Sequence, residues 1–237
     1  MQIVQLTNQP ANTPFAPTWN YLLLENETSL DAETIEGFKT FILNNEKNIV
    51  ESFKSDYESY NKEYGVVFDG NTGLGPKSLT SRSPFYNLLK IDDFYIQKIK
   101  NTIYENYLKY LEIINVQRRD VWIQSWSNVL RKGESISEHI HASHVNTWLG
   151  GHITIACEDT STFYKAPVRL VEDQVYQSLN NPGKLTLFPD CIPHWTDTHN
   201  GNEERISIAF DIITDERYNE LNKERQAMYM RFDNASN

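Results

Sequence analysis

The chain has 237 residues, which is enough for one domain with a large core. Hydrophobic residues make up 39% of it and charged residues 23%, with 10 Gly and 9 Pro, and this composition excludes collagen-like, linker-like and strongly disordered chains. The formal net charge of −10 opposes broad binding to phosphate backbones, so a nucleic-acid partner is not expected.

The sequence predicts neither export nor membrane insertion. Its start has no basic segment leading into a long apolar one, and no later stretch is apolar enough to span a bilayer. The two cysteines, Cys157 and Cys191, can form one bridge at most. The fold therefore does not need a disulfide framework, and a cytoplasmic location is expected.

The first half of the chain is predicted to be mainly helical. Residues 1–30 combine prolines with short apolar pieces and predict an extended arm or an edge strand. Apolar residues at helical spacing predict amphipathic helices over about 31–53 and 91–114. The polar stretch 54–85 between them predicts loops and short turns.

After Arg119 the pattern changes from helical to alternating. Runs rich in β-branched residues at 121–126, 151–155, 184–188 and 205–212 predict strands. A last amphipathic segment, about 215–230, is expected to cap this β unit. The predicted fold class is α+β in a single domain, with helical support over 1–118, a β core over 119–213, and a C-terminal helix and tail over 214–237.

All 6 histidines fall between residues 139 and 199, inside the β half. In a strand, His139 and His141 project from the same face while Ile140 points the other way, and adjacent imidazoles suit a metal ion. His194 follows the strand predicted at 184–188, so two distant strands of one barrel could supply a metal site. The alternative is a pair of surface histidines on an edge strand.

The last predicted strand separates two kinds of side chain. Ile206, Ile208 and Phe210 share one face, while Arg205 and Ser207 share the other. If the isoleucines pack in the core, Arg205 faces a cavity, where it needs an anionic partner such as a small dicarboxylate. The alternative is an outward-facing Arg on a solvated strand.

The order of these segments resembles the 2-oxoglutarate-Fe(II) oxygenase family, in a branch frequent among phages and marine bacteria. The matching pieces, within about residues 120–212, are Trp126-Ser-Asn128, His139-Ile-His141, Leu187-Phe-Pro189 with His194, and Arg205-Ile-Ser207. The resemblance implies a double-stranded β-helix (jelly roll) core braced by the N-terminal helices. It implies Fe(II) held by His139, His141 and His194, and 2-oxoglutarate held by Arg205 and Ser207. Asn128, on the same strand face as Trp126, is a further candidate for contact with 2-oxoglutarate.

The resemblance also implies an activity. It predicts a dioxygenase that hydroxylates a small molecule or a protein side chain and releases succinate and CO2. The location would be the cytoplasm, or the host cytoplasm for a phage-encoded protein. Fold alone does not identify the prime substrate.

Position 141 departs from the family pattern, because most relatives carry Asp or Glu there. The metal-binding triad is therefore either three histidines or includes a carboxylate from elsewhere. His144 is an alternative ligand, but we expect His139 and His141 because residues i and i+2 converge without a bulge.

Two other classes are left open. In a cupin, a three-histidine metal site would occupy the same type of barrel, and Gly133 followed by His139-x-His141 fits the first half of that motif. In a metal-free structural protein, the histidines would be dispersed.

Overall fold

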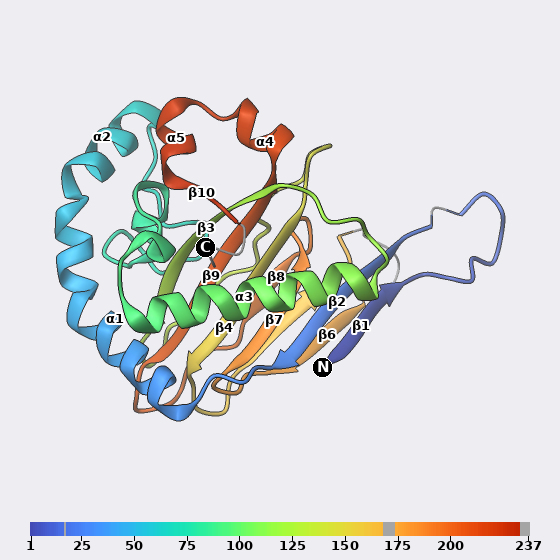
Figure 1. Cartoon of the computed structure of the whole chain (residues 1–237), viewed down its shortest axis with the longest axis horizontal. Coiled ribbons are helices and arrows are strands. Elements are labelled where there is room, and N and C mark those ends of the chain that lie inside the picture. Colours follow the sequence, from blue (N-terminus) through green and yellow to red (C-terminus); the bar gives the residue numbers. More distant parts are fainter. Residues whose placement is uncertain (17, 168–173, 233–237) are drawn as a thin grey trace.

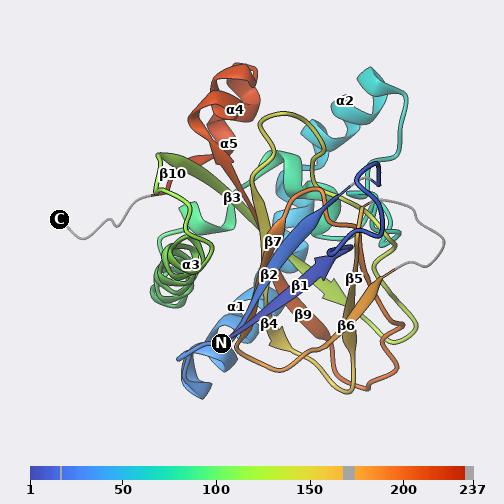
Figure 2. The same cartoon turned by 90° about the vertical axis from the view of Figure 1, so that its right-hand side faces the viewer.

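The computed structural model describes residues 1–16, 18–167 and 174–232 of the chain. Helices and two antiparallel sheets form three layers (Figure 1). Figure 2 shows helix α3 on one side of the larger sheet and strands β5 and β6 on the other. The predicted α+β class is confirmed.

The larger or major sheet has the strand order β1-β2-β7-β4-β9-β3-β10, and the smaller or minor sheet has the order β6-β5-β8. The strands are β1 (Gln2–Thr7), β2 (Asn20–Glu27), β3 (Val121–Leu130), β4 (Leu149–Ala156), β5 (Ser161–Lys165), β6 (Val175–Leu179), β7 (Lys184–Pro189), β8 (His194–Thr196), β9 (Arg205–Thr214) and β10 (Met230–Arg231). The helices are α1 (Ala32–Ser52), α2 (Lys54–Tyr64), α3 (Phe94–Ile113), α4 (Asp215–Glu220) and α5 (Lys223–Met228), with 3-10 turns η1 (Thr80–Phe85) and η2 (Leu88–Lys90).

The two long helices begin at aspartate caps. The Asp31 carboxylate accepts a hydrogen bond from Thr34 N at 2.7 Å at the start of α1, and Asp93 does the same for Tyr95 N at the start of α3. Both helices bury their apolar faces in the main core, as the sequence predicted. None of the helices in the described part of the chain combines the length and apolar character needed to cross a membrane.

Strand β9 lies between β4 and β3 in the major sheet, and its two faces separate the core from the cavity. Ile206, Ile208 and Phe210 are fully buried in the main core. Arg205 and Ser207 alternate with them and therefore face the other way, toward the minor sheet. Of the two alternatives for this strand, the structure therefore has the one in which the isoleucines pack in the core and Arg205 faces the cavity.

Residues 54–85 differ from the predicted loops, because they contain α2 and η1. Aromatic rather than aliphatic contacts hold α2: Tyr57 is buried, and the Arg82 guanidinium lies 3.9 Å from its ring centre. Gly65, with φ +64°, ends the helix in the left-handed conformation. The prediction failed because this helix is mostly polar and packs through tyrosines, so apolar residues do not recur clearly at helical spacing.

Both ends of the chain add strands to the major sheet. Strand β1 lies at its edge, as predicted, but β2 lies between β1 and β7 and is an internal strand. The predicted C-terminal amphipathic segment is two short helices, because Asn222 interrupts it and caps α5 through Arg225 N. Strand β10 then pairs with β3.

The close approach of β4, β7 and β9 predicts a large effect of Gly151→Ala. An added Cβ would lie 2.5 Å from Phe210 Cζ and 2.7 Å from the Thr186 carbonyl oxygen. We expect the free energy of unfolding to fall by about 1–3 kcal/mol, as for other overpacked cores. Urea unfolding measures this, with Val145→Ala, at a 99% exposed position, as the control. Equal midpoints for the two variants would contradict the packing described here.

Candidate functional site

A cavity of about 330 Å³ collects side chains from both sheets and from the segment before η1. The major sheet contributes Asn128, Ser207 and Arg205, and the minor sheet contributes Thr162 and Trp195. His139, His141 and His194 line the same cavity. The predicted metal-binding and co-substrate residues therefore meet in one place.

The three histidines form a compact group. Their ring centres are 4.3 Å apart for His139 and His194, 4.9 Å for His141 and His194, and 5.6 Å for His139 and His141. One nitrogen from each lies within 4.8 Å of the other two. The prediction that His139 and His141 belong to a strand is wrong: His139 forms only an isolated bridge with His194. The backbone there still brings the two rings together, with their centres 5.6 Å apart.

In each of these histidines the Nδ1 atom lies close to an oxygen atom of the protein. The Nδ1 atom lies 2.8 Å from Ser137 O in His139 and 3.0 Å from Ile192 O in His194. His141 Nδ1 lies 2.5 Å from Asp211 Oδ1. This leaves the three Nε2 atoms for a shared ion. Metal-binding histidines characteristically present one nitrogen to the ion and bind a carbonyl or a carboxylate through the other.

The protonation states of these three histidines favour the binding of a cation. Burial, together with the charge of His141, lowers the pKa of His139 to about 4, and burial holds the pKa of His194 well below its usual value. Burial would also lower the pKa of His141, but the Asp211 carboxylate outweighs it and raises that pKa. The cavity is therefore lined by two imidazoles with lowered pKa values, which are neutral, and by His141, whose pKa is raised.

His144 does not join this group. It is exposed, and its Nδ1 accepts the backbone N–H of Asn146 at 3.0 Å. A carboxylate source does exist nearby: Asp190 and Asp211 form a second possible ligand group with His141. Burial and the neighbouring Asp211 raise the pKa of Asp190 to about 8. Sequence analysis missed both aspartates because strand pairing brings them beside His141.

Arg205 lies buried at another part of the cavity. Its Nη2 donates to Thr162 Oγ1 at 3.2 Å, while Nε and Nη1 have no hydrogen-bond partner among the described residues. Ser207 lies two residues on along the same face, and Asn128 is directly opposite Ser207 in the β3–β9 register. Asn128 Oδ1 is held by Thr80 Oγ1 at 2.5 Å. A guanidinium with unused buried donors fits an anionic ligand.

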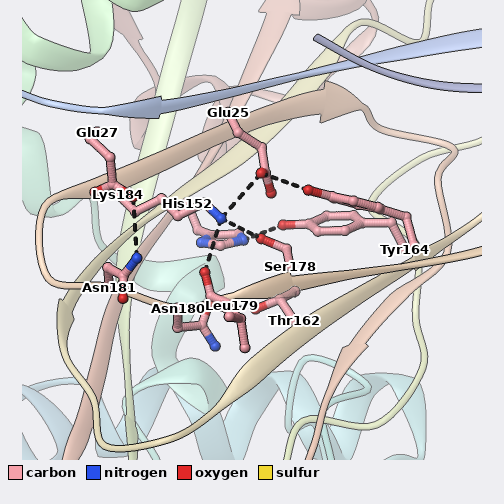
Figure 3. A network of polar contacts seen from close by, with 11 residues as sticks. Glu25, Glu27, His152, Thr162, Tyr164, Ser178, Leu179, Asn180, Asn181 and Lys184 are labelled. Atoms are coloured by element: carbon pink, nitrogen blue, oxygen red, sulfur yellow. Dashed lines mark hydrogen bonds and ion pairs between the residues drawn. The ribbon is translucent and has the colours of Figure 1, made fainter. Parts of the chain in front are cut away.

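A polar network lies behind this part of the cavity (Figure 3). Lys184 forms a buried ion pair with Glu25 at 3.1 Å, and the Tyr176 hydroxyl donates to Glu25 at 2.8 Å. His152, which lines the cavity, contacts the Tyr164 hydroxyl at 2.5 Å through Nε2. Side chains from β2, β4, β5, β6 and β7 thus brace the wall to which Arg205 is bound.

The remaining walls are aromatic and polar. Of the tryptophans considered for the substrate side, Trp126 and Trp195 line the cavity. Trp148 does not line it and packs against the core. Sequence analysis missed two contributors: the segment from Tyr60 to Pro84, which it assigned to loops, and Arg225 of α5.

The family comparison matches the β core. Residues 124–211 match the model of a family described as "Putative 2OG-Fe(II) oxygenase". This segment is similar to members of the 2OG-Fe(II) oxygenase family. The match confirms the predicted family and the prediction of an oxidoreductase that uses Fe(II) and 2-oxoglutarate, and it favours an oxygenase over a cupin.

Solved structures of such oxygenases support the same fold for this chain. A prolyl-4-hydroxylase from Pseudomonas putida is 8% identical over 81% of this chain and 92% of its own, with a TM-score of 0.50. The carbocyclase SnoK from nogalamycin biosynthesis is 9% identical over 81% and 79%, with a TM-score of 0.51. The predicted double-stranded β-helix is confirmed. No curated protein matches the chain.

The pKa pattern predicts how metal affinity depends on pH. His139, with a pKa of about 4, is neutral above about pH 5, and burial lowers the pKa of His194 well below its usual value, whereas His141, with its raised pKa, keeps a proton that an ion must displace. Affinity for Zn²⁺, measured by chelator competition, should fall as the pH falls, with a slope of about one proton per ion between about pH 5 and 6.5. A slope near three, or an affinity independent of pH, would contradict this assignment.

Proposed function

We propose that the protein is an Fe(II)- and 2-oxoglutarate-dependent dioxygenase that hydroxylates a small molecule or a protein side chain. His139, His141 and His194 would hold the iron, and Arg205, Ser207 and Asn128 would bind 2-oxoglutarate. The observation that carries the proposal is one cavity containing three histidines with free Nε2 atoms and a buried arginine with two unpaired donors.

The donor set fits Fe(II). Three imidazole nitrogens on one side of an ion leave positions open on the other side, the arrangement on which non-haem iron oxygenases depend. Bound iron would supply the oxidising chemistry by which O2 places one oxygen atom in a substrate C–H bond and the other in succinate, as 2-oxoglutarate loses CO2.

The protein's own residues bind and orient. The unpaired Nε and Nη1 of Arg205 would receive a carboxylate of 2-oxoglutarate, and the Ser207 hydroxyl, on the same face, would donate to the same ligand. Thr162 holds the guanidinium in place through Nη2. Trp126 and Trp195 cover part of the cavity wall and would limit water around the reacting atoms.

The metal assignment predicts one Fe(II) per chain under anaerobic conditions. Replacing His194 by Ala removes the buried member of the group and should abolish stoichiometric binding. His144→Ala is the matched control, because His144 is exposed and outside the group, and it should bind as the wild type does. Undiminished iron in the His194 variant, counted by colorimetric assay after gel filtration, would refute the assignment.

The co-substrate assignment predicts a specific loss in Arg205→Ala. Losing a buried charge partner typically costs about 2–5 kcal/mol, which corresponds to roughly 30-fold to several-thousand-fold weaker 2-oxoglutarate binding. Fe(II) binding should be unchanged. Anaerobic titration of the Fe(II) protein, followed by its visible absorption, measures this, with Arg217→Ala on α4 as the control. Coincident curves for the two variants would exclude this role for Arg205.

An assay of substrate turnover provides a further test of the proposed dioxygenase activity. Succinate formed from 2-oxoglutarate and O2 should increase when the true substrate is added from a panel of small molecules and peptides. The increase should disappear in Arg205→Ala. Succinate formation that does not require added Fe(II) would contradict the proposed function.

A further inference from the structure

The three cavity histidines differ in what holds their second nitrogen. His139 and His194 face backbone carbonyls, of Ser137 and Ile192. His141 instead faces a carboxylate oxygen of Asp211 at 2.5 Å. Within this group, His141 is therefore the ligand candidate whose partner carries a full charge.

The fold builds the contact between His141 and Asp211 from three strands. Asp211 stands on β9, opposite Gln124 of β3 on one side and Gly150 of β4 on the other. A Cβ atom at Gly150 would lie 2.7 Å from His141 Nδ1, so the absence of a side chain there leaves room for the ring. The Asp211 side chain is only 21% exposed, which limits competition from water.

We propose that Asp211 is a positioning residue for the metal centre. Its carboxylate, 2.5 Å from His141 Nδ1, pairs with the imidazole, turns Nε2 toward the ion, and supplies negative charge that three imidazoles lack. A carboxylate bound to a ligand imidazole raises the basicity of the ligating nitrogen. This inference rests on the proposed function, because it needs His141 to be a metal ligand.

The neighbouring aspartates offer a competing arrangement. Ligand atoms of His141, Asp190 and Asp211 also lie within 4.8 Å of one another, so an ion could sit on the Nδ1 side of His141 instead. His139 and His194 would then take no part. The experiment must distinguish a carboxylate that binds the ion from one that binds only the histidine.

The test replaces Asp211 by Asn, which keeps the size of the side chain and removes its charge. Asp215→Asn on α4 is the matched control, because it changes the charge equally and Asp215 does not line the cavity. Fe(II) and Co²⁺ affinities are measured anaerobically, together with the Fe(III)/Fe(II) midpoint potential and the visible spectrum of the Co²⁺ protein.

We expect D211N to bind metal about 10- to 100-fold more weakly than the wild type, with unchanged stoichiometry. Its midpoint potential should be more positive, because the lost negative charge favoured Fe(III), while its Co²⁺ spectrum should keep the wild-type coordination number. D211E, which restores the charge, should recover most of both shifts. If D211N does not fold, D211S provides a second neutral variant with the same expected shifts.

Three outcomes are decisive against the inference. Affinity and potential equal to those of D215N would show that Asp211 does not act on the centre, with the proposed function intact. A changed Co²⁺ coordination number in D211N, with full binding retained by His194→Ala, would make Asp211 a ligand. A wild-type protein that binds neither ion would refute the proposed metal site itself, and this inference with it.

Discussion

The alternation of side chains along β9 is the constraint on which the rest of the molecule depends. This strand pairs with both β3 and β4, so its two faces belong to different environments. Ile206, Ile208 and Phe210 join the core beneath the helices, and Arg205, Ser207 and Asp211 face the cavity. A slip of one residue would exchange the two sets, placing a guanidinium in the core and isoleucines beside the histidines. The site and the core therefore specify the same strand register.

Periodicity in the sequence predicted what depends on local pattern. The long helices, the central strands and the convergence of His139 and His141 follow from spacing along the chain, whereas spacing left two alternatives for the face of Arg205. The predictions that failed concern residues whose structural partners lie far away in the sequence. Strand β2 is internal because β7 pairs with it, and Asp211 reaches His141 because β9 and the segment after β3 come together. The prediction of loops for residues 54–85 missed helix α2 for another reason. The tyrosines of this helix pack on an arginine and on one another, so the helix has no stripe of aliphatic residues that a sequence pattern would reveal.

The cavity is organised for ligands rather than for stability. Arg205 Nε and Nη1 and Asp190 Oδ1 are buried without hydrogen-bond partners among the described residues, and each such group costs about 1–3 kcal/mol. Natural cores rarely tolerate several of these atoms in one place. Their cost is offset by the extensive burial around α1, α3 and the major sheet. A ligand that satisfies them recovers that free energy on binding, so occupancy and stability of the fold are linked.

The position of β9 between β4 and β3 also affects how the chain folds during its synthesis. Before β9 is synthesised, the major sheet exists only as two separate pieces, β1-β2-β7-β4 and β3 with its neighbouring segments. Each piece has an open edge, at β4 and at β3, and both edges offer unpaired backbone groups to other chains. The part of the cavity wall that carries Arg205, Ser207 and Asp211 is therefore added only when β9 enters between them. Nascent or truncated chains that end before Arg205 would be the aggregation-prone forms of this protein, and those most in need of chaperones.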